Sequence, residues 1–142
     1  MLNRILTPGT GAAYAFLRVV TGLLFAFHGM QKLFGYQFPA EYLPKIGSQG
    51  WIGAIIELAT GLLIAAGAFT SWAAFLASGT MAVAYTQFHW KFAVGPNFFP
   101  PINKGELALV YSVLFLYFAC VGGGKWSLDG WWTRRKLRNP PA

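Results

Sequence analysis

Four apolar segments, each close to the length that crosses a bilayer, take up most of the sequence and constrain its fold most strongly. We place them at residues 12–34, 51–69, 72–92 and 105–121. A helix needs about 20 apolar residues to cross a hydrocarbon core of roughly 30 Å. This spacing predicts an all-α fold, an integral membrane four-helix bundle with antiparallel up-down helices in one domain. The alternative is a soluble helical bundle with a very apolar core.

Charge is scarce in the apolar segments and gathers after the last of them. Only 11% of the residues are charged, against about 25% in a typical soluble domain. Residues 125–142 form a basic tail. Such a tail could bind nucleic acid, but beside a membrane segment it is typical of a cytoplasmic anchor. We therefore expect a lipid partner, no nucleic acid and both termini in the cytoplasm, with residues 126–132 amphipathic on the membrane surface.

Several ionisable residues interrupt the apolar segments at the ends that face away from both termini. They are His28, Lys32, Glu57, His89 and Glu106. The expected topology places them in the outer half of the bundle, below a loop that carries Asn103 and Lys104. An ionisable group at the bilayer centre costs at least about 2.5–3.5 kcal/mol unless it is paired. We expect Glu57 to pair with Lys32 or His28, and Glu106 with His89 or Lys104.

These polar groups allow two interpretations. The pairs can serve only to fix helix order and register. Alternatively, they form a polar pocket that binds a ligand or handles protons. The residues of this predicted pocket are His28, Lys32, Glu57, Tyr85, His89, Asn103 and Glu106.

Metal binding is weakly indicated by the same residues. His28 and His89 beside carboxylates could bind a metal, but their spacing forms no tight motif and we predict no metal site. The chain has one cysteine, Cys120, so it cannot form an internal disulfide or a redox dithiol. We interpret Cys120 as a small buried apolar residue.

Arg18 stands apart from the other basic residues of the first segment. It lies deep in that segment on the cytoplasmic side, where Asp129 is the expected acid. We predict a structural ion pair between them. On the second segment, Gly53 and Gly61 flank Glu57 at four-residue spacing, which predicts a close approach of another helix. A stripe of small residues over 74–82 predicts either packing within the chain or a homo-oligomer interface.

Four motifs along the chain resemble those of the DoxX family. Residues 17–35 resemble the opening of that family, and residues 57–63 resemble the pattern of its second helix. Residues 103–108 resemble the Asn-Gly-Gly-Glu motif that opens its fourth helix, with Lys104 in place of the first glycine. Residues 122–129 resemble its closing Gly-x-Gly-x-x-Ser-Leu-Asp motif.

The resemblance implies a four-helix protein of the bacterial inner membrane with a link to redox chemistry. A related branch, DoxD, resembles the membrane subunit of thiosulfate:quinone oxidoreductase. The resemblance implies a subunit that hosts a quinone or similar amphiphile, with no intrinsic cofactor and with electrons or substrate supplied by a protein partner. A non-catalytic anchor or assembly subunit of a redox-stress or metal-handling complex is the alternative. A small-solute carrier ranks lower, because no apolar segment is broken and no inverted repeat is present.

Overall fold

The computed structural model describes residues 7–37 and 39–138, and each regular element in this part of the chain is a helix. The elements in chain order are η1 (Thr7–Gly9), α2 (Thr10–Phe34), η2 (Ala40–Tyr42), α3 (Gln49–Ala66), α4 (Thr70–Ala84), η3 (Tyr85–Trp90), η4 (Pro96–Phe98), α5 (Pro100–Asn103), α6 (Glu106–Val121) and α7 (Leu128–Arg138). Element η3 is a π-helix that continues α4. The all-α prediction is confirmed.

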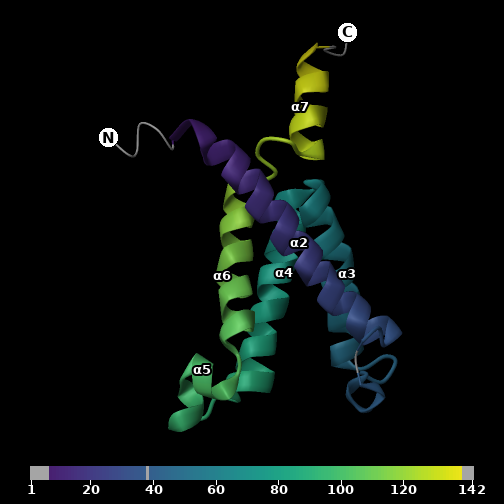
Figure 1. Ribbon diagram of the computed structural model, residues 1–142, viewed down its shortest axis with the longest axis vertical. Coiled ribbons are helices and arrows are strands. Elements are labelled where there is room, and N and C mark those ends of the chain that lie inside the picture. The colour runs from purple at the N-terminus through teal and green to yellow at the C-terminus, as the bar shows by residue number, and fades with distance from the viewer. Residues whose placement is uncertain (1–6, 38, 139–142) are drawn as a thin grey trace.

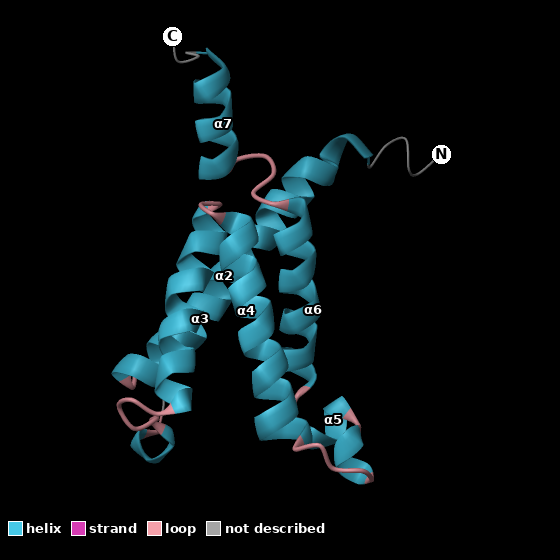
Figure 2. Cartoon of the chain, turned by 180° about the vertical axis from the view of Figure 1, so that it is seen from behind, coloured by secondary structure: helices cyan, strands magenta, loops and turns pink. Residues whose placement is uncertain are grey.

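The long helices form two pairs that diverge toward one end of the molecule. Helix α2 packs along α3, and α4 packs along α6, while α3 and α4 contact each other and join the pairs (Figure 1). Figure 2 shows the pairs separating away from α7. We call the end that holds η1 and α7 the tail end. The loop end holds residues 35–37, 39–48 and 91–105. The two pairs are therefore farther apart at the loop end than at the tail end.

Glycines allow α2 and α3 to approach each other closely. A Cβ atom added to Gly61 would lie 2.5 Å from the backbone nitrogen of Ala26, and one added to Gly22 would lie 2.8 Å from the Gly61 carbonyl oxygen. No side chain fits at such distances, so glycine is required at this crossing. The close approach predicted at Gly61 is confirmed. At Gly53 the prediction is wrong, because no atom lies within 4 Å of an added Cβ.

Aromatic side chains join the two pairs where α2 meets α6. The ring of Phe25 on α2 lies 5.6 Å from that of Tyr111 and 4.7 Å from that of Phe115 on α6, measured between centroids. Buried Ser78 of α4 donates a hydrogen bond of 2.7 Å to the Ser112 carbonyl oxygen of α6. The buried part of the small-residue stripe, Ala74 and Ser78, therefore packs within the chain.

Two helices in the described part of the chain are long and apolar enough to cross a membrane. They are Thr7–Phe34 and Gln49–Ala66, whereas Glu106–Val121 is apolar but shorter. Helix α3 ends earlier than the predicted residue 69 because Gly67, at φ 69°, ends it in the left-handed conformation. The next helix begins at Thr70, so the link between the helices is Gly67–Phe69 and not the predicted residues 70 and 71.

Helix α7 extends beyond the ends of the other helices instead of folding back over them (Figure 1). Its first turn is fixed by the link between α3 and α4, because the Asp129 backbone nitrogen donates to the Gly67 carbonyl oxygen at 2.9 Å. The ring of Trp132 lies 5.5 Å from that of Phe69 in the same link. Of residues 126–132, which we expected on the membrane surface, only those from Leu128 onward belong to this helix. The helix continues to Arg138.

Candidate functional site

A buried ion pair joins α2 to α3 between the two helix pairs. Lys32 Nζ lies 2.6 Å from Glu57 Oε1 and 2.8 Å from Oε2. Only 4% of the Glu57 side chain is exposed, against 35% for Lys32. A buried carboxylate needs a charged or hydrogen-bonding partner, and of the two partners expected for Glu57 the structure places Lys32 there.

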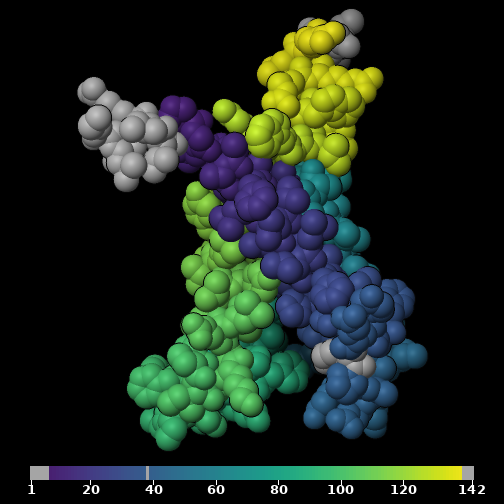
Figure 3. Space-filling view, in the orientation of Figure 1, coloured from purple at the N-terminus to yellow at the C-terminus, as the bar shows by residue number. Residues whose placement is uncertain are grey.

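Two cavities meet at this ion pair, and together we call them the cleft. The larger, of about 460 Å³, lies between α3 and α4. The smaller, of about 220 Å³, lies between α2 and α6. Both are lined by Lys32, Glu57, Met81, Ala84 and His89. Figure 3 shows the molecule hollowed at the loop end, where the two helix pairs separate.

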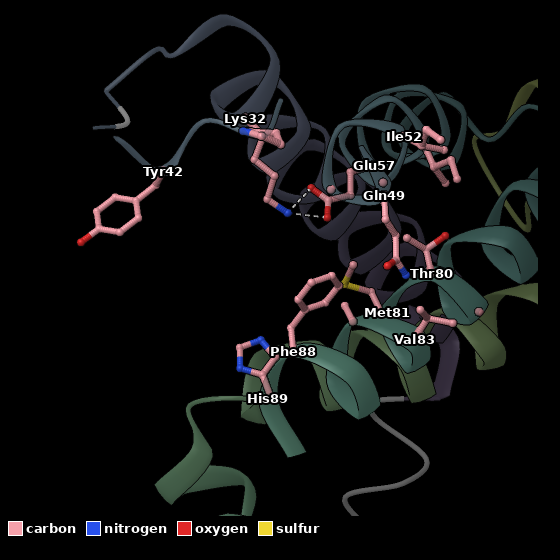
Figure 4. A pocket seen from close by; sticks show the side chains of 16 residues that line it. Lys32, Tyr42, Gln49, Ile52, Glu57, Thr80, Met81, Val83, Phe88 and His89 are labelled. Atoms are coloured by element: carbon pink, nitrogen blue, oxygen red, sulfur yellow. Dashed lines mark hydrogen bonds and ion pairs between the residues drawn. The ribbon is translucent and has the colours of Figure 1, made fainter. Parts of the chain in front are cut away.

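The π-helix η3 brings His89 to the cleft from the side opposite the ion pair. His89 Nδ1 lies 3.2 Å from the Asn103 carbonyl oxygen. A carbonyl oxygen only accepts, so Nδ1 carries the hydrogen in this contact. The second ring nitrogen, Nε2, is then free to bond a ligand. Figure 4 shows the ion pair on one wall of the larger cavity and Phe88 with His89 on the other. π-helical turns occur frequently at functional sites.

The remaining walls of the cleft combine one more histidine with apolar side chains. His28 lines the smaller cavity and has no hydrogen-bond partner among the described residues. Met81 lines both cavities, and Phe88 lines the larger one. At the loop end Gln49 donates a 2.7 Å hydrogen bond from Nε2 to Oε1 of Gln87, which links α3 to η3. The cleft is thus mainly apolar, with its polar groups concentrated around the ion pair.

Three of the predicted pocket residues do not line the cleft. Tyr85 packs against Gly105, where an added Cβ would lie 2.8 Å from its ring, and stacks on Trp90. Asn103 stabilises the loop, because its Oδ1 accepts from the Gly105 backbone nitrogen at 2.7 Å. Glu106 is exposed and lines a groove on the outer face of α6.

The predicted pairing of Glu106 is wrong. In the described part of the chain it forms no ion pair with His89 or Lys104, and the ion pair present there joins Lys32 to Glu57. The turn before α6 explains the difference. Lys104 has a φ of 58° and Gly105 packs tightly after it, so that α6 begins with Glu106 directed outward. Lys104 itself lines the smaller cavity.

Comparison with known proteins decides the family. The DoxX family model matches residues 13–90, which is more than half of the chain. The chain belongs to the DoxX family. An uncharacterized protein of Haemophilus influenzae is 41% identical over 119 residues, which cover 81% of this chain and 87% of that protein. The Escherichia coli protein named inner membrane protein YqjF is 29% identical over 115 residues, which cover 79% of this chain and 85% of that protein.

No solved structure matches the chain significantly. The DoxX match covers most of α2 and all of α3, α4 and η3, and therefore includes Lys32, Glu57 and His89. Residues 103–106 and 122–129, which resemble later motifs of the family, lie outside the match. The family, the named relative and the apolar helices make this DoxX chain a membrane protein.

The predicted ion pair between Arg18 and Asp129 is also wrong, although both residues lie at the tail end of the DoxX chain. The fully buried Arg18 donates from Nη1 to the carbonyl oxygens of Ile64 and Ala65 at 2.5 and 2.7 Å, and from Nη2 to that of Trp126 at 2.9 Å. The first two carbonyls belong to the last turn of α3, which leaves its carbonyls without helical partners and carries the negative end of the helix dipole.

Asp129 binds the other side of the same link. Its Oδ1 accepts from the Phe69 backbone nitrogen at 2.8 Å. Its Oδ2 accepts from the backbone nitrogen and the hydroxyl of Thr70 at 2.9 and 2.7 Å. Backbone groups at helix ends thus bind both charged side chains, and this competition with a direct pair was not visible in the sequence.

Metal-binding geometry is absent from the described part of the DoxX chain, where no group of three or more His, Cys, Asp and Glu side chains could hold an ion. Cys120 is exposed on α6, so the interpretation of a buried residue was wrong. Sequence reasoning also missed Gly79, Met81 and Phe88 as cleft residues. A glycine within an apolar helix was the available signal for the first of them.

Proposed function

We propose that this DoxX chain crosses the bacterial inner membrane four times, through α2, α3, α4 with η3, and α6, as an antiparallel up-down bundle. The proposal is supported by the relative named as an inner membrane protein. It is also supported by the position of the start of α2 and of the basic helix α7 at the same end of the molecule (Figure 1). The positive-inside rule then puts both termini in the cytoplasm. The cleft would open toward the outer face.

Within this topology, we propose that the cleft binds a quinone or a similar amphiphile. The observation that carries the proposal is the position of the Lys32–Glu57 pair where the two cavities meet. Ligand sites are mostly apolar with a few convergent polar groups, and have volumes of about 300–1,000 Å³. Lys32 is a donor for a quinone carbonyl, and His89 Nε2 offers a second polar contact from the opposite wall.

The proposed role is that of a membrane subunit in a redox complex. Cys120 is the single cysteine, so the chain cannot cycle between a dithiol and a disulfide by itself. Electrons for the bound quinone would therefore come from a partner protein. The chain's own residues would hold the ring and donate hydrogen bonds to its carbonyl oxygens. Glu57 and His89 would exchange protons with it.

Binding of a benzoquinone with one isoprenoid unit to the protein in lipid nanodiscs tests this function. We expect saturable binding by the wild-type chain. Lys32→Met and Glu57→Gln should bind at least about tenfold more weakly, because each removes a polar contact where the two cavities meet. Glu41→Gln, in the exposed element η2, is the control and should bind as the wild type does. Absence of saturable binding by the wild type would reject the quinone role.

Helix α7 favours a second function, that of a non-catalytic anchor or assembly subunit. The helix is fixed to the α3–α4 link yet exposes Trp131, over which Arg135 lies at 5.3 Å from the ring centroid. Arginine and tryptophan are enriched where proteins bind each other. Charge reversal at Arg134 and Arg138 should then release a partner from complexes isolated from native membranes. If Glu57→Gln leaves both assembly and activity of that complex intact, the anchor function replaces the quinone function.

A further inference from the structure

Two glycines on facing helices leave open space where glycine is not needed for packing. A Cβ added to Gly53 on α3 or to Gly79 on α4 would meet no atom within 4 Å. By contrast, a Cβ added to Gly29 would lie 2.5 Å from the Ala54 carbonyl oxygen. A glycine inside a helix is less favourable than alanine. Contact between helices therefore accounts for Gly29 but not for Gly53 or Gly79.

Both open glycines line the larger cavity of the cleft. Since neither has a side chain, bare helix backbone forms part of two opposite walls. Apolar side chains, among them Ile56 and Met81, complete the same cavity. The Lys32–Glu57 pair also lines this cavity and is its charged group. Gln49 and Thr80 add polar groups to the lining. The cavity is therefore a slot that combines two bare backbone patches, apolar side chains and a charged pair.

The rim of the slot is apolar on the side between α3 and α4. Ile52, Val83 and Phe88 line the cavity and are 50%, 41% and 54% exposed, respectively. Exposed apolar side chains on a membrane protein face lipid. A bound molecule can thus place a hydrocarbon chain across this rim while its polar end stays at the ion pair.

We propose that Gly53 and Gly79 determine which ligand shape the slot accepts. Their missing side chains leave room between α3 and α4 for a flat ring, and a straight acyl chain does not need that width. The ring lies against the two backbone patches, its polar substituents face Lys32, Glu57 and His89, and its tail leaves between Ile52 and Val83 into the bilayer. The ligand class is a ring-bearing, lipid-soluble molecule. This inference rests on the proposed function, which places an amphiphile in the cleft.

Leucine substitutions that fill the slot test the inference. Gly53→Leu and Gly79→Leu add an apolar side chain to open space, whereas Ala59→Leu and Ala82→Leu add the same side chain to exposed positions of the same helices. The probes are the benzoquinone with one isoprenoid unit and a dodecyl-chain fatty acid, each titrated onto protein in nanodiscs. We expect the quinone to bind at least about tenfold more weakly to the slot variants, and within about twofold of the wild type to the controls.

The two proposals fail in different ways. If the wild type and both slot variants bind the quinone equally, the role of the glycines is overturned while the proposed function stands. If the wild type binds the fatty acid but not the quinone, ring selection and the quinone role are both wrong. If it binds neither probe, the proposed function fails and this inference fails with it. Should a leucine variant not fold, Gly53→Ala and Gly79→Ala replace it and should weaken quinone binding in the same direction by a smaller factor.

Discussion

Asp129 caps the N-terminus of α4 at Thr70, 59 residues earlier in the chain. The carboxylate accepts from the backbone nitrogen and the hydroxyl of Thr70, so a residue of α7 performs what an N-cap residue performs locally. Arg18 binds the last carbonyls of α3 on the other side of the same link. Each charge therefore complements the dipole of a helix end.

Removing this cap should destabilise the protein. Asp129→Ala leaves the Phe69 and Thr70 nitrogens without their acceptor and removes the side-chain bonds between α7 and the link. We expect the free energy of unfolding to fall by about 2 kcal/mol. Thermal unfolding in detergent micelles, with Glu41→Ala as an exposed acidic control, measures the effect. An unchanged unfolding midpoint for Asp129→Ala would show that the cap contributes no stability.

Alanine at the two glycines on either side of Glu57 should have opposite effects. Gly61→Ala forces α3 away from α2, because the new Cβ would lie 2.5 Å from the Ala26 nitrogen, and should cost about 1–3 kcal/mol. Gly53→Ala meets no atom within 4 Å and should stabilise the helix by about 0.5–1 kcal/mol. Unfolding titrations in mixed micelles compare them. Destabilisation by both substitutions would contradict the open space at Gly53.

Removal of either member of the buried ion pair should be destabilising, and unequally so. Lys32→Met leaves a carboxylate whose side chain is only 4% exposed, and we expect a loss of about 3 kcal/mol. Glu57→Gln leaves a lysine that is 35% exposed and can extend toward water, so its loss should be smaller. The same titrations rank the two variants. The reverse order would mean that Lys32, and not Glu57, depends more on the pair.

Lys104 occupies a backbone conformation that suits glycine. Its φ is 58°, in the left-handed region that costs a residue with a side chain about 1–2 kcal/mol. Lys104→Gly should therefore raise the free energy of unfolding by about 0.5 kcal/mol after the entropy of glycine in the unfolded chain is subtracted. Lys104→Ala, which keeps a Cβ, is the control and should bring no gain. Equal midpoints for both variants would show that the turn is not strained.

The sequence was most informative where one helix determines the outcome. Apolar length predicted the long helices to within a few residues, and α2 ends at Phe34 as expected. The expectation that Glu57 pairs with Lys32 or His28 followed from the cost of a buried charge, and the structure selects Lys32. Family motifs predicted the family that comparison then confirmed.

Sequence reasoning failed where a group had partners in the backbone. Arg18 and Asp129 were paired by charge alone, although carbonyls and backbone nitrogens at helix ends were stronger competitors. Glu106 was assigned to the cluster because of its position in the chain, but the turn at Lys104 sets the direction in which α6 begins.

The sequence by itself determined the helical class and the family, and it limited the partner of Glu57 to Lys32 or His28, because apolar length and the cost of unpaired charge act locally or between neighbouring helices. Only the tertiary structure decided that the helices diverge in two pairs and leave a cleft around Lys32 and Glu57. The same glycine residue type packs tightly at Gly61 and lines open space at Gly53. That difference depends on the crossing of whole helices, which no local pattern of residues encodes.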